Sequence, residues 1–218
     1  MSSSDRPPLE NYANNVYIVC VNIDEILASE EGPRRTAALV KWLQSLFEGD
    51  AGVPVLVGGA AVQLYTLGAY TTGDVDLIGT VTPRAAGALT AAGFERRGRH
   101  WIHEAAQVFV EFPASALEPE EESTWIELEG QRVLVISIED LLVDRLGAWQ
   151  YWKSSVDGVN AWLLWRAQRQ RIDAERLERR LTRSGWLTAW RSLARFSARW
   201  ENDEPPPEEV GEWANAGP

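Results

Sequence analysis

The chain has 218 residues, enough for one ordinary domain or two small ones with a core of their own. Its single cysteine, Cys20, excludes a disulfide scaffold, and no stretch approaches the roughly 20 apolar residues that a membrane span needs. The polar start lacks the basic region and apolar run of a signal peptide. We therefore expect a soluble, cytoplasmic protein.

The net charge is −11, from 21 Lys and Arg against 32 Asp and Glu, which at first argues against a nucleic-acid partner. The charge is unevenly distributed, because residues 1–165 carry −12, residues 166–199 carry +7, and residues 200–218 carry −6. The basic segment has two interpretations. It is a solvated helix face with pairs such as Glu175–Arg179, or it receives RNA phosphates, an acidic partner or the acidic end of its own chain. The RNA contacts expected there are Arg176, Arg179 and Arg183.

In chain order, residues 1–15 are expected to form a flexible tail, and residues 16–136 an α/β core. The apolar run 16–23 fits a strand or a buried helix equally well. Apolar spacing, with Gly and Pro as breaks, predicts three helices in this core, at 34–47, 60–67 and 82–93. The strands predicted by the same signals are 53–57, 74–78, 94–97, 100–103, 107–112, 125–128 and 132–136.

From Ser137 onward the pattern is helical. Ser137 with Asp140 three residues later resembles a capping box, and apolar residues follow at helical spacing. Further helices are predicted near 157–170, 173–183 and 185–200, while the acidic, Pro-rich residues 201–218 are expected to form a tail that buries little. The predicted fold class is α+β: a mixed β-sheet flanked by helices, followed by a C-terminal helical bundle over 137–200.

The informative segment is GGAAVQLYTLGAYTTGDVDL, residues 58–77. Gly58 and Gly59 stand at a strand-to-helix turn, where backbone N–H groups can approach a phosphate, although such turns also occur for packing reasons. Asp74 and Asp76 leave the same face of a strand, and two like charges so close favour a cation between them. Mg²⁺ suits such carboxylates, whereas the structural alternative is a solvated strand end.

A third carboxylate, Glu111, lies in the otherwise apolar run QVFVEFP. If its strand neighbours residues 74–78, Glu111 completes a cluster with Asp74 and Asp76. The simpler alternative is a glutamate that is paired, or faces solvent, near a strand end.

The segments VLVGGAAVQLY, TTGDVDLIG and VFVEFP resemble the nucleotidyltransferase superfamily pattern: Gly-Gly after a hydrophobic strand, Asp-x-Asp, and a later third acid. More narrowly, ISIEDLLVDRLGAW and SSVDGVNAWLL are similar to helical segments of bacterial AbiEii-like and minimal nucleotidyltransferases, which include toxin–antitoxin members. The resemblance covers about residues 53–168. It implies a nucleotidyltransferase-like fold.

It also implies transfer of a nucleotide from a nucleoside triphosphate to a hydroxyl of RNA or protein, with an antitoxin as partner if the chain is a toxin. By this resemblance the phosphates lie on Gly58 and Gly59 beside Thr72, and Mg²⁺ is held by Asp74 and Asp76. Glu111 holds a second ion or orients the acceptor hydroxyl. In the helices, Arg145 neutralises the triphosphate, and Asp157 orients Arg145 or touches the nucleotide.

Three positions depart from the family pattern. Arg145 replaces a frequent lysine, Tyr70 stands where an arginine is frequent, and Asn160 replaces the second aspartate of the helical motif. These departures leave the carboxylates intact. They keep two alternatives open: a small-molecule nucleotidyltransferase of the antibiotic-modifying type, and a non-catalytic module that binds a nucleotide or a partner.

Two further patterns are weighed and set aside. His100 and His103 point to opposite faces of a strand, so a shared metal is not expected. Seven of the eleven tryptophans fall in 149–200, and six of these form the pairs Trp149/Trp152, Trp162/Trp165 and Trp186/Trp190. Core packing is the simpler interpretation of these pairs, and base stacking on nucleic acid the more specific one.

Overall fold

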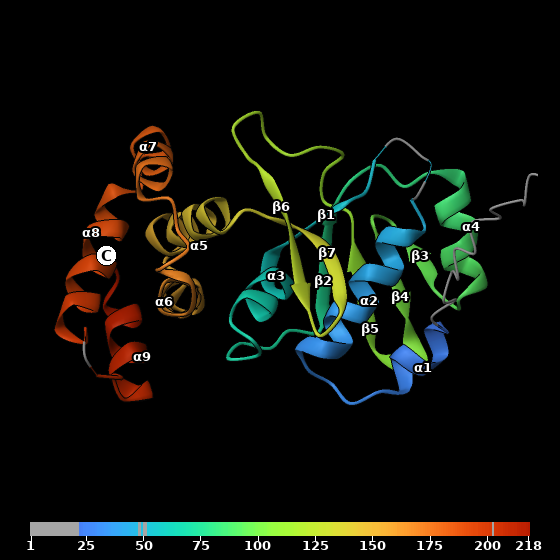
Figure 1. The fold of residues 1–218 in the computed structure, drawn as a ribbon, viewed down its shortest axis with the longest axis horizontal. Coiled ribbons are helices and arrows are strands. Elements are labelled where there is room, and N and C mark those ends of the chain that lie inside the picture. The colour runs from blue at the N-terminus through green and yellow to red at the C-terminus, as the bar shows by residue number, and fades with distance from the viewer. Residues whose placement is uncertain (1–21, 48, 50–51, 202) are drawn as a thin grey trace, which may run out of the picture.

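The computed structural model describes residues 22–47, 49, 52–201 and 203–218. It is a mixed α+β structure in which a seven-stranded sheet flanked by helices is followed by a C-terminal helical region (Figure 1). This confirms the predicted fold class and the mixed sheet. The expected tail 1–15 and most of the undecided run 16–23, with Cys20, lie outside the described residues.

The sheet half contains α1 (Ile23–Ala28), α2 (Pro33–Ser45), β1 (Val55–Val57), α3 (Gly58–Tyr65), β2 (Asp74–Ile78), α4 (Pro83–Ala91), β3 (Glu95–Arg97), β4 (His100–His103), β5 (Val108–Glu111), β6 (Ser123–Leu128) and β7 (Gln131–Ile136). The strand order is β3-β4-β5-β2-β1-β7-β6. The sheet is mixed because β2 pairs with β5 and β1 with β7 in parallel, whereas the other neighbours are antiparallel.

The face of each strand follows its alternating sequence. Val75 and Leu77 are buried beneath the helices, which places Asp74 and Asp76 on the opposite face. On the covered face, α2 and α3 pack side by side, and α2 buries Val40 and Leu43. Each such side chain contributes about 1.5–3 kcal/mol when removed from water.

Gln44 ties α2 to the sheet where β1 and β7 separate. Its Nε2 donates to the carbonyls of Pro54 (2.9 Å) and Leu134 (2.7 Å), and its Oε1 accepts from the Leu134 N–H (3.0 Å). Strands β1 and β7 are paired in register only at Leu56 and Val135. The buried Gln44 amide therefore provides hydrogen bonds to backbone groups that the two strands do not bond to each other.

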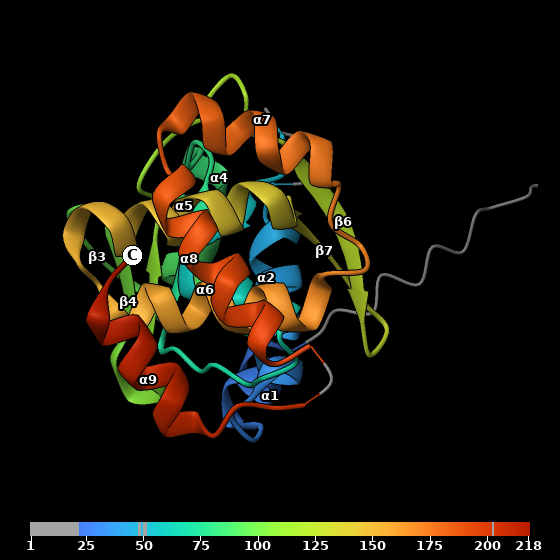
Figure 2. The same ribbon diagram turned by 90° about the vertical axis from the view of Figure 1, so that its left-hand side faces the viewer.

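The C-terminal region contains α5 (Ile138–Trp152), α6 (Ser155–Gln168), α7 (Ala174–Ser184), α8 (Leu187–Arg199) and α9 (Pro207–Ala216). Figure 2 shows these helices grouped on one side of the sheet half. The predicted cap at Ser137 is confirmed, because its hydroxyl accepts the Asp140 N–H at 3.2 Å. Among the described residues, no helix has the length and apolar character needed to cross a membrane.

The prediction that residues 201–218 bury little is wrong. Despite its acids, α9 carries Val210, Trp213 and Ala214 on one face, and Val210 and Ala214 are buried. The Trp149 Nε1 donates to the Ala214 carbonyl (2.8 Å), and the ring centroids of Trp149 and Trp213 lie 4.5 Å apart. Three well-spaced apolar residues are enough to dock this helix on α6.

Candidate functional site

The predicted neighbourhood of the acidic strands is present in the sheet. The parallel register of β2 and β5 sets Asp76 opposite Glu111 and Asp74 opposite Phe109. All four residues therefore share the face that lies opposite the covering helices. The sheet brings Asp74, Asp76 and Glu111 to one region, as the sequence predicted.

The glycine pair lies against the same region. Gly58 has a φ of +67°, and a Cβ at this position would stand 2.1 Å from the Asp76 Oδ2, so no other residue fits without a shift. Here β1 turns directly into α3, which begins at Gly58, two residues before the predicted helix start. The sharp turn brings the first turn of a helix to the carboxylate.

Thr72 links the second glycine to the acidic strand. A Cβ at Gly59 would lie 3.2 Å from the Thr72 side chain, and the Thr72 hydroxyl accepts the Asp74 N–H at 3.3 Å. The glycines are thus needed for close packing, and what packs on them is Asp76 and Thr72, both predicted site residues.

Asp76 carries charge that its neighbours do not neutralise. Burial raises its pKa above the ordinary value, and the charges of Glu111 and Asp74 raise it further, while Arg145 and His100 oppose the shift only in part. Among the described residues, no side chain donates a hydrogen bond to its carboxylate or forms an ion pair with it. The site is therefore short of positive charge at this carboxylate.

Glu111 has partners that the sequence analysis did not identify. Arg99 Nε lies 2.6 Å from the Glu111 Oε1, and His100 Nδ1 lies 3.5 Å from the Oε2. The antiparallel register of β4 and β5 pairs His100 directly with Glu111. Pairing the predicted strands 100–103 and 107–112 directly across their turn would set His100 opposite Val110, so the contact with Glu111 depends on a register shifted by one residue.

The helical half supplies the predicted Arg145–Asp157 pair. Arg145 Nη1 donates to the Asp157 Oδ1 at 2.7 Å, and Arg145 Nε donates to Asp144 at 3.0 Å. Burial of the guanidinium works against its charge, but Asp144 and Asp157 outweigh it and raise the Arg145 pKa. Asn160, at the departing position, is buried, and its Oδ1 has no hydrogen-bond partner in the described part of the chain.

The donor set fits Mg²⁺ in its chemistry and is incomplete in its geometry. Hard carboxylate oxygens on Asp74 and Asp76 stand on one strand face, and the raised Asp76 pKa marks a place where a cation would relieve repulsion. Glu111, however, is turned to Arg99. Accordingly, no group of three His, Cys, Asp or Glu side chains is arranged to hold a metal among the residues described. Asp74 and Asp76 offer carboxylate oxygens from one face of the strand, and Glu111 could join them only after leaving Arg99.

The arginines of α7 are largely used within the molecule. Arg176 and Arg180 contact the buried Asp140 at 2.5 and 2.7 Å, and Arg183 pairs with Glu120. The Arg176 guanidinium is therefore engaged by internal acids, and contact of this segment with RNA stays a prediction. The predicted Glu175–Arg179 pair is present at 3.8 Å.

Contacts with the acidic C-terminal end also form, through Arg166–Glu204 and Arg199–Glu209. The chain's own acids therefore account for part of the basic segment, which was one of the interpretations of its charge.

The tryptophan pairs mostly belong to the core. Trp149 and Trp162 are buried, and Trp165 stacks edge-to-face on Trp190 with ring centroids 5.1 Å apart. Trp152 is the exception, with an exposed ring at the end of α5. His100 and His103 have separate partners, since His103 Nδ1 accepts the Ala106 N–H (3.2 Å) while His100 faces Glu111.

Comparison with family models, with curated proteins and with solved structures found no match for this chain.

Proposed function

We propose that this chain is a Mg²⁺-dependent nucleotidyltransferase with a nucleotidyltransferase-like fold. It moves a nucleoside monophosphate from a nucleoside triphosphate to a hydroxyl, which loses its proton, and releases pyrophosphate. The observation that carries the proposal is the position of Asp76. Its under-compensated carboxylate stands in register with Glu111 and against the glycine that begins α3. The sequence resemblance over 53–168 supports the same activity.

Asp74 and Asp76 would hold Mg²⁺, which supplies Lewis-acid polarisation of the reacting phosphate and of the attacking hydroxyl. The chain supplies position and charge. The N–H groups at the start of α3 would bind phosphate oxygens, since that helix end presents free donors and the positive end of its dipole.

Arg145 would neutralise charge on the triphosphate, held in orientation by its 2.7 Å bond to Asp157. Glu111 would orient the acceptor hydroxyl by accepting its hydrogen bond. For that, the carboxylate must exchange its contact with Arg99 for one with the substrate.

Incubation with α-³²P-labelled nucleoside triphosphates, Mg²⁺ and total RNA or cell extract tests the activity. We expect label transfer by the wild type and none by Asp76→Asn, while Glu127→Gln, which changes an exposed acid on β6 of the same sheet, transfers normally. Absence of transfer by the wild type, or equal transfer by Asp76→Asn, contradicts the proposal.

The labelled product identifies the acceptor class. Label on RNA or on a protein fits the AbiEii-like, toxin–antitoxin type, for which a co-purifying antitoxin is the expected partner. Label on an antibiotic or other small molecule, with none on macromolecules, fits the small-molecule type.

The contact of Glu111 with Arg99 favours one second candidate, a non-catalytic nucleotide-binding module. It predicts that calorimetry detects nucleotide binding without Mg²⁺ and after Asp74→Ala. Binding that requires both Mg²⁺ and Asp74 favours the enzyme instead.

A further inference from the structure

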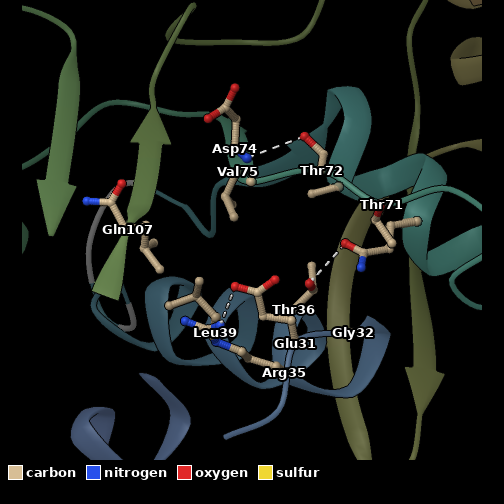
Figure 3. Close-up of a pocket in the computed structure, with 14 residues that line it drawn as sticks. Glu31, Gly32, Arg35, Thr36, Leu39, Thr71, Thr72, Asp74, Val75 and Gln107 are labelled. Carbon is tan, nitrogen blue, oxygen red and sulfur yellow. Dashed lines mark hydrogen bonds and ion pairs between the residues drawn. The ribbon is translucent and has the colours of Figure 1, made fainter. Parts of the chain in front are cut away.

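A cavity of about 330 Å³ lies on the helix-covered side of the sheet, and Thr72 and Asp74 of the candidate site are among the residues that line it. It opens between α2, α3 and the beginnings of β2 and β5. Figure 3 shows Val75 directed into it, whereas the Asp74 carboxylate points away from it. Because adjacent residues of a strand face opposite sides, the cavity and the Asp76 side chain lie on opposite faces of the sheet, although Thr72 and Asp74 border both.

Arg35 is the one basic residue among the described residues that line this cavity, beside the acids Glu31 and Asp74, and its hydrogen bonds are long. Its side chain is 11% exposed, yet Nη1 reaches the Glu31 Oε1 only at 3.3 Å and Nη2 reaches the Ala106 carbonyl only at 3.5 Å. A guanidinium offers five N–H donors, and these two bonds are at the long end of the normal range. A charge this deeply buried ordinarily has a close, well-aligned counter-ion.

Glu31 is a poor permanent counter-ion. Its side chain is 90% exposed, and its described polar contact is the one with Arg35, drawn as a dashed line in Figure 3. Water screens a carboxylate in this position, so little holds it against a competing anion. Glu31 therefore occupies the place that another oxyanion can take.

Further donors face the same space. Gln63 is 2% exposed; its Oε1 accepts from the Thr36 hydroxyl at 3.0 Å, and its Nε2 donates to no partner among the described residues. The Thr71 side chain also lines the cavity. Apolar surface from Leu39, Val75 and Val108 forms the remainder, which suits a short carbon skeleton.

We propose that this cavity is a binding site for a small molecule that bears a carboxylate or a phosphate. The oxyanion of the ligand displaces Glu31 from Arg35 and accepts a hydrogen bond from the Gln63 amide. The volume lies near the lower end of the roughly 300–1,000 Å³ of ligand pockets, so the ligand has the size of a small metabolite.

Titration of the full-length, ¹⁵N-labelled protein with sodium phosphate and, separately, sodium succinate tests the proposal, with sodium chloride at equal ionic strength as the blank. We expect saturable NMR shifts that include a glutamine side-chain amide absent in Gln63→Leu. Arg35→Gln should weaken binding by more than about tenfold, because it removes a charged hydrogen-bond donor. Glu31→Gln should tighten it by about threefold, because it removes an exposed competing carboxylate.

Arg34→Gln is the matched control, since it removes one charge from the neighbouring position, where the side chain is 83% exposed and faces Glu129. It should bind like the wild type. Tighter binding of phosphate than of succinate identifies a phosphate ligand, and the reverse order a carboxylate.

The proposal is overturned if neither anion saturates, if Arg34→Gln loses as much affinity as Arg35→Gln, or if Glu31→Gln brings no gain. Because Glu31 is exposed, the affinity of Glu31→Gln for the anions tests the proposal even if Arg35→Gln fails to fold. Asp76→Asn should bind both anions unchanged, which separates this site from the proposed enzymatic activity.

Discussion

Two aspartates with arginines nearby, the half-buried Asp76 in the sheet and the buried Asp140 in α5, differ in the direction of their pKa shifts. Asp140 accepts hydrogen bonds from Arg176, Arg180, the Ser137 hydroxyl and the Glu122 N–H. Burial alone would raise its pKa, but these bonds outweigh it and lower the pKa. Asp76 faces other acids, so its pKa is raised.

The difference lies in where each arginine is committed. Arg176 and Arg180 reach across from α7 to Asp140 itself, whereas Arg145 is held by Asp144 and Asp157 and acts on Asp76 only from a distance. A carboxylate whose charge is neutralised by hydrogen-bonded arginines stabilises the fold. A carboxylate without such partners lowers the free energy of unfolding and can bind a cation from solution.

The largest expected effect is on catalysis. Asp76→Asn should lower nucleotide transfer by about 10³-fold or more, because it removes the charge that would hold Mg²⁺. The same change should raise the free energy of unfolding by roughly 1 kcal/mol in metal-free buffer, since it relieves repulsion from Asp74 and Glu111. Labelled-nucleotide assays and urea unfolding measure the two. A variant that loses stability along with activity would place Asp76 in the same class as Asp140.

The next effect is on the fold. Asp140→Asn should lower the free energy of unfolding by about 3 kcal/mol, because it removes the buried acid that lies nearest to the partly buried Arg176 and Arg180. Glu175→Gln, which breaks the exposed pair with Arg179, should change it by less than about 0.5 kcal/mol. Urea unfolding at pH 7 compares them. Equal losses would show that the Asp140 cluster is no more than a surface network.

The pH dependence of the two aspartates should differ in sign. The folded-state pKa of Asp140 is below the ordinary value of 3.8, so its stabilisation is present above that pH and is lost as the pH falls through the folded value. The folded-state pKa of Asp76 is above 3.8, so its ionisation costs stability as the pH rises from 3.8 through the folded value.

Unfolding curves in EDTA from pH 3 to 7 test this difference. The advantage of Asp76→Asn over the wild type should grow as the pH rises. The deficit of Asp140→Asn should shrink below pH 3.8. If the stability differences of both variants from the wild type change with pH in the same direction, the predicted contrast between Asp76 and Asp140 is wrong.

The smallest expected effect concerns Glu111. Arg99→Gln frees this carboxylate from its 2.6 Å partner and should tighten Mg²⁺ binding severalfold, because the arginine no longer competes with the ion. The neighbouring exposed pair offers a control in Arg97→Gln, which removes a similar charge from β3 but contacts Glu95 and Glu104 instead. Calorimetric titration with Mg²⁺ compares the three proteins, and weaker binding by Arg99→Gln would mean that Arg99 supports the site.

Much of this architecture was readable from local pattern. Glycine breaks and apolar periodicity located α2, β2 and α4 closely, and the spacing of Asp74 and Asp76 put both on one strand face. The same local patterns did not predict α9, because its acids and prolines outnumber its three apolar residues. These residues become buried or partly buried only once the chain folds and they contact α6 and Trp149.

The sequence by itself determined which residues carry charge, which strands alternate, and that a strand turns into a helix at Gly58 and Gly59. Only the tertiary structure decided which arginines meet Asp140, because these ion pairs join elements far apart in the chain: Asp140 in α5 with Arg176 and Arg180 in α7. Strand register likewise brought Arg99 and His100 to Glu111. Pairing of this kind depends on distances between packed elements, and local propensity does not encode those distances.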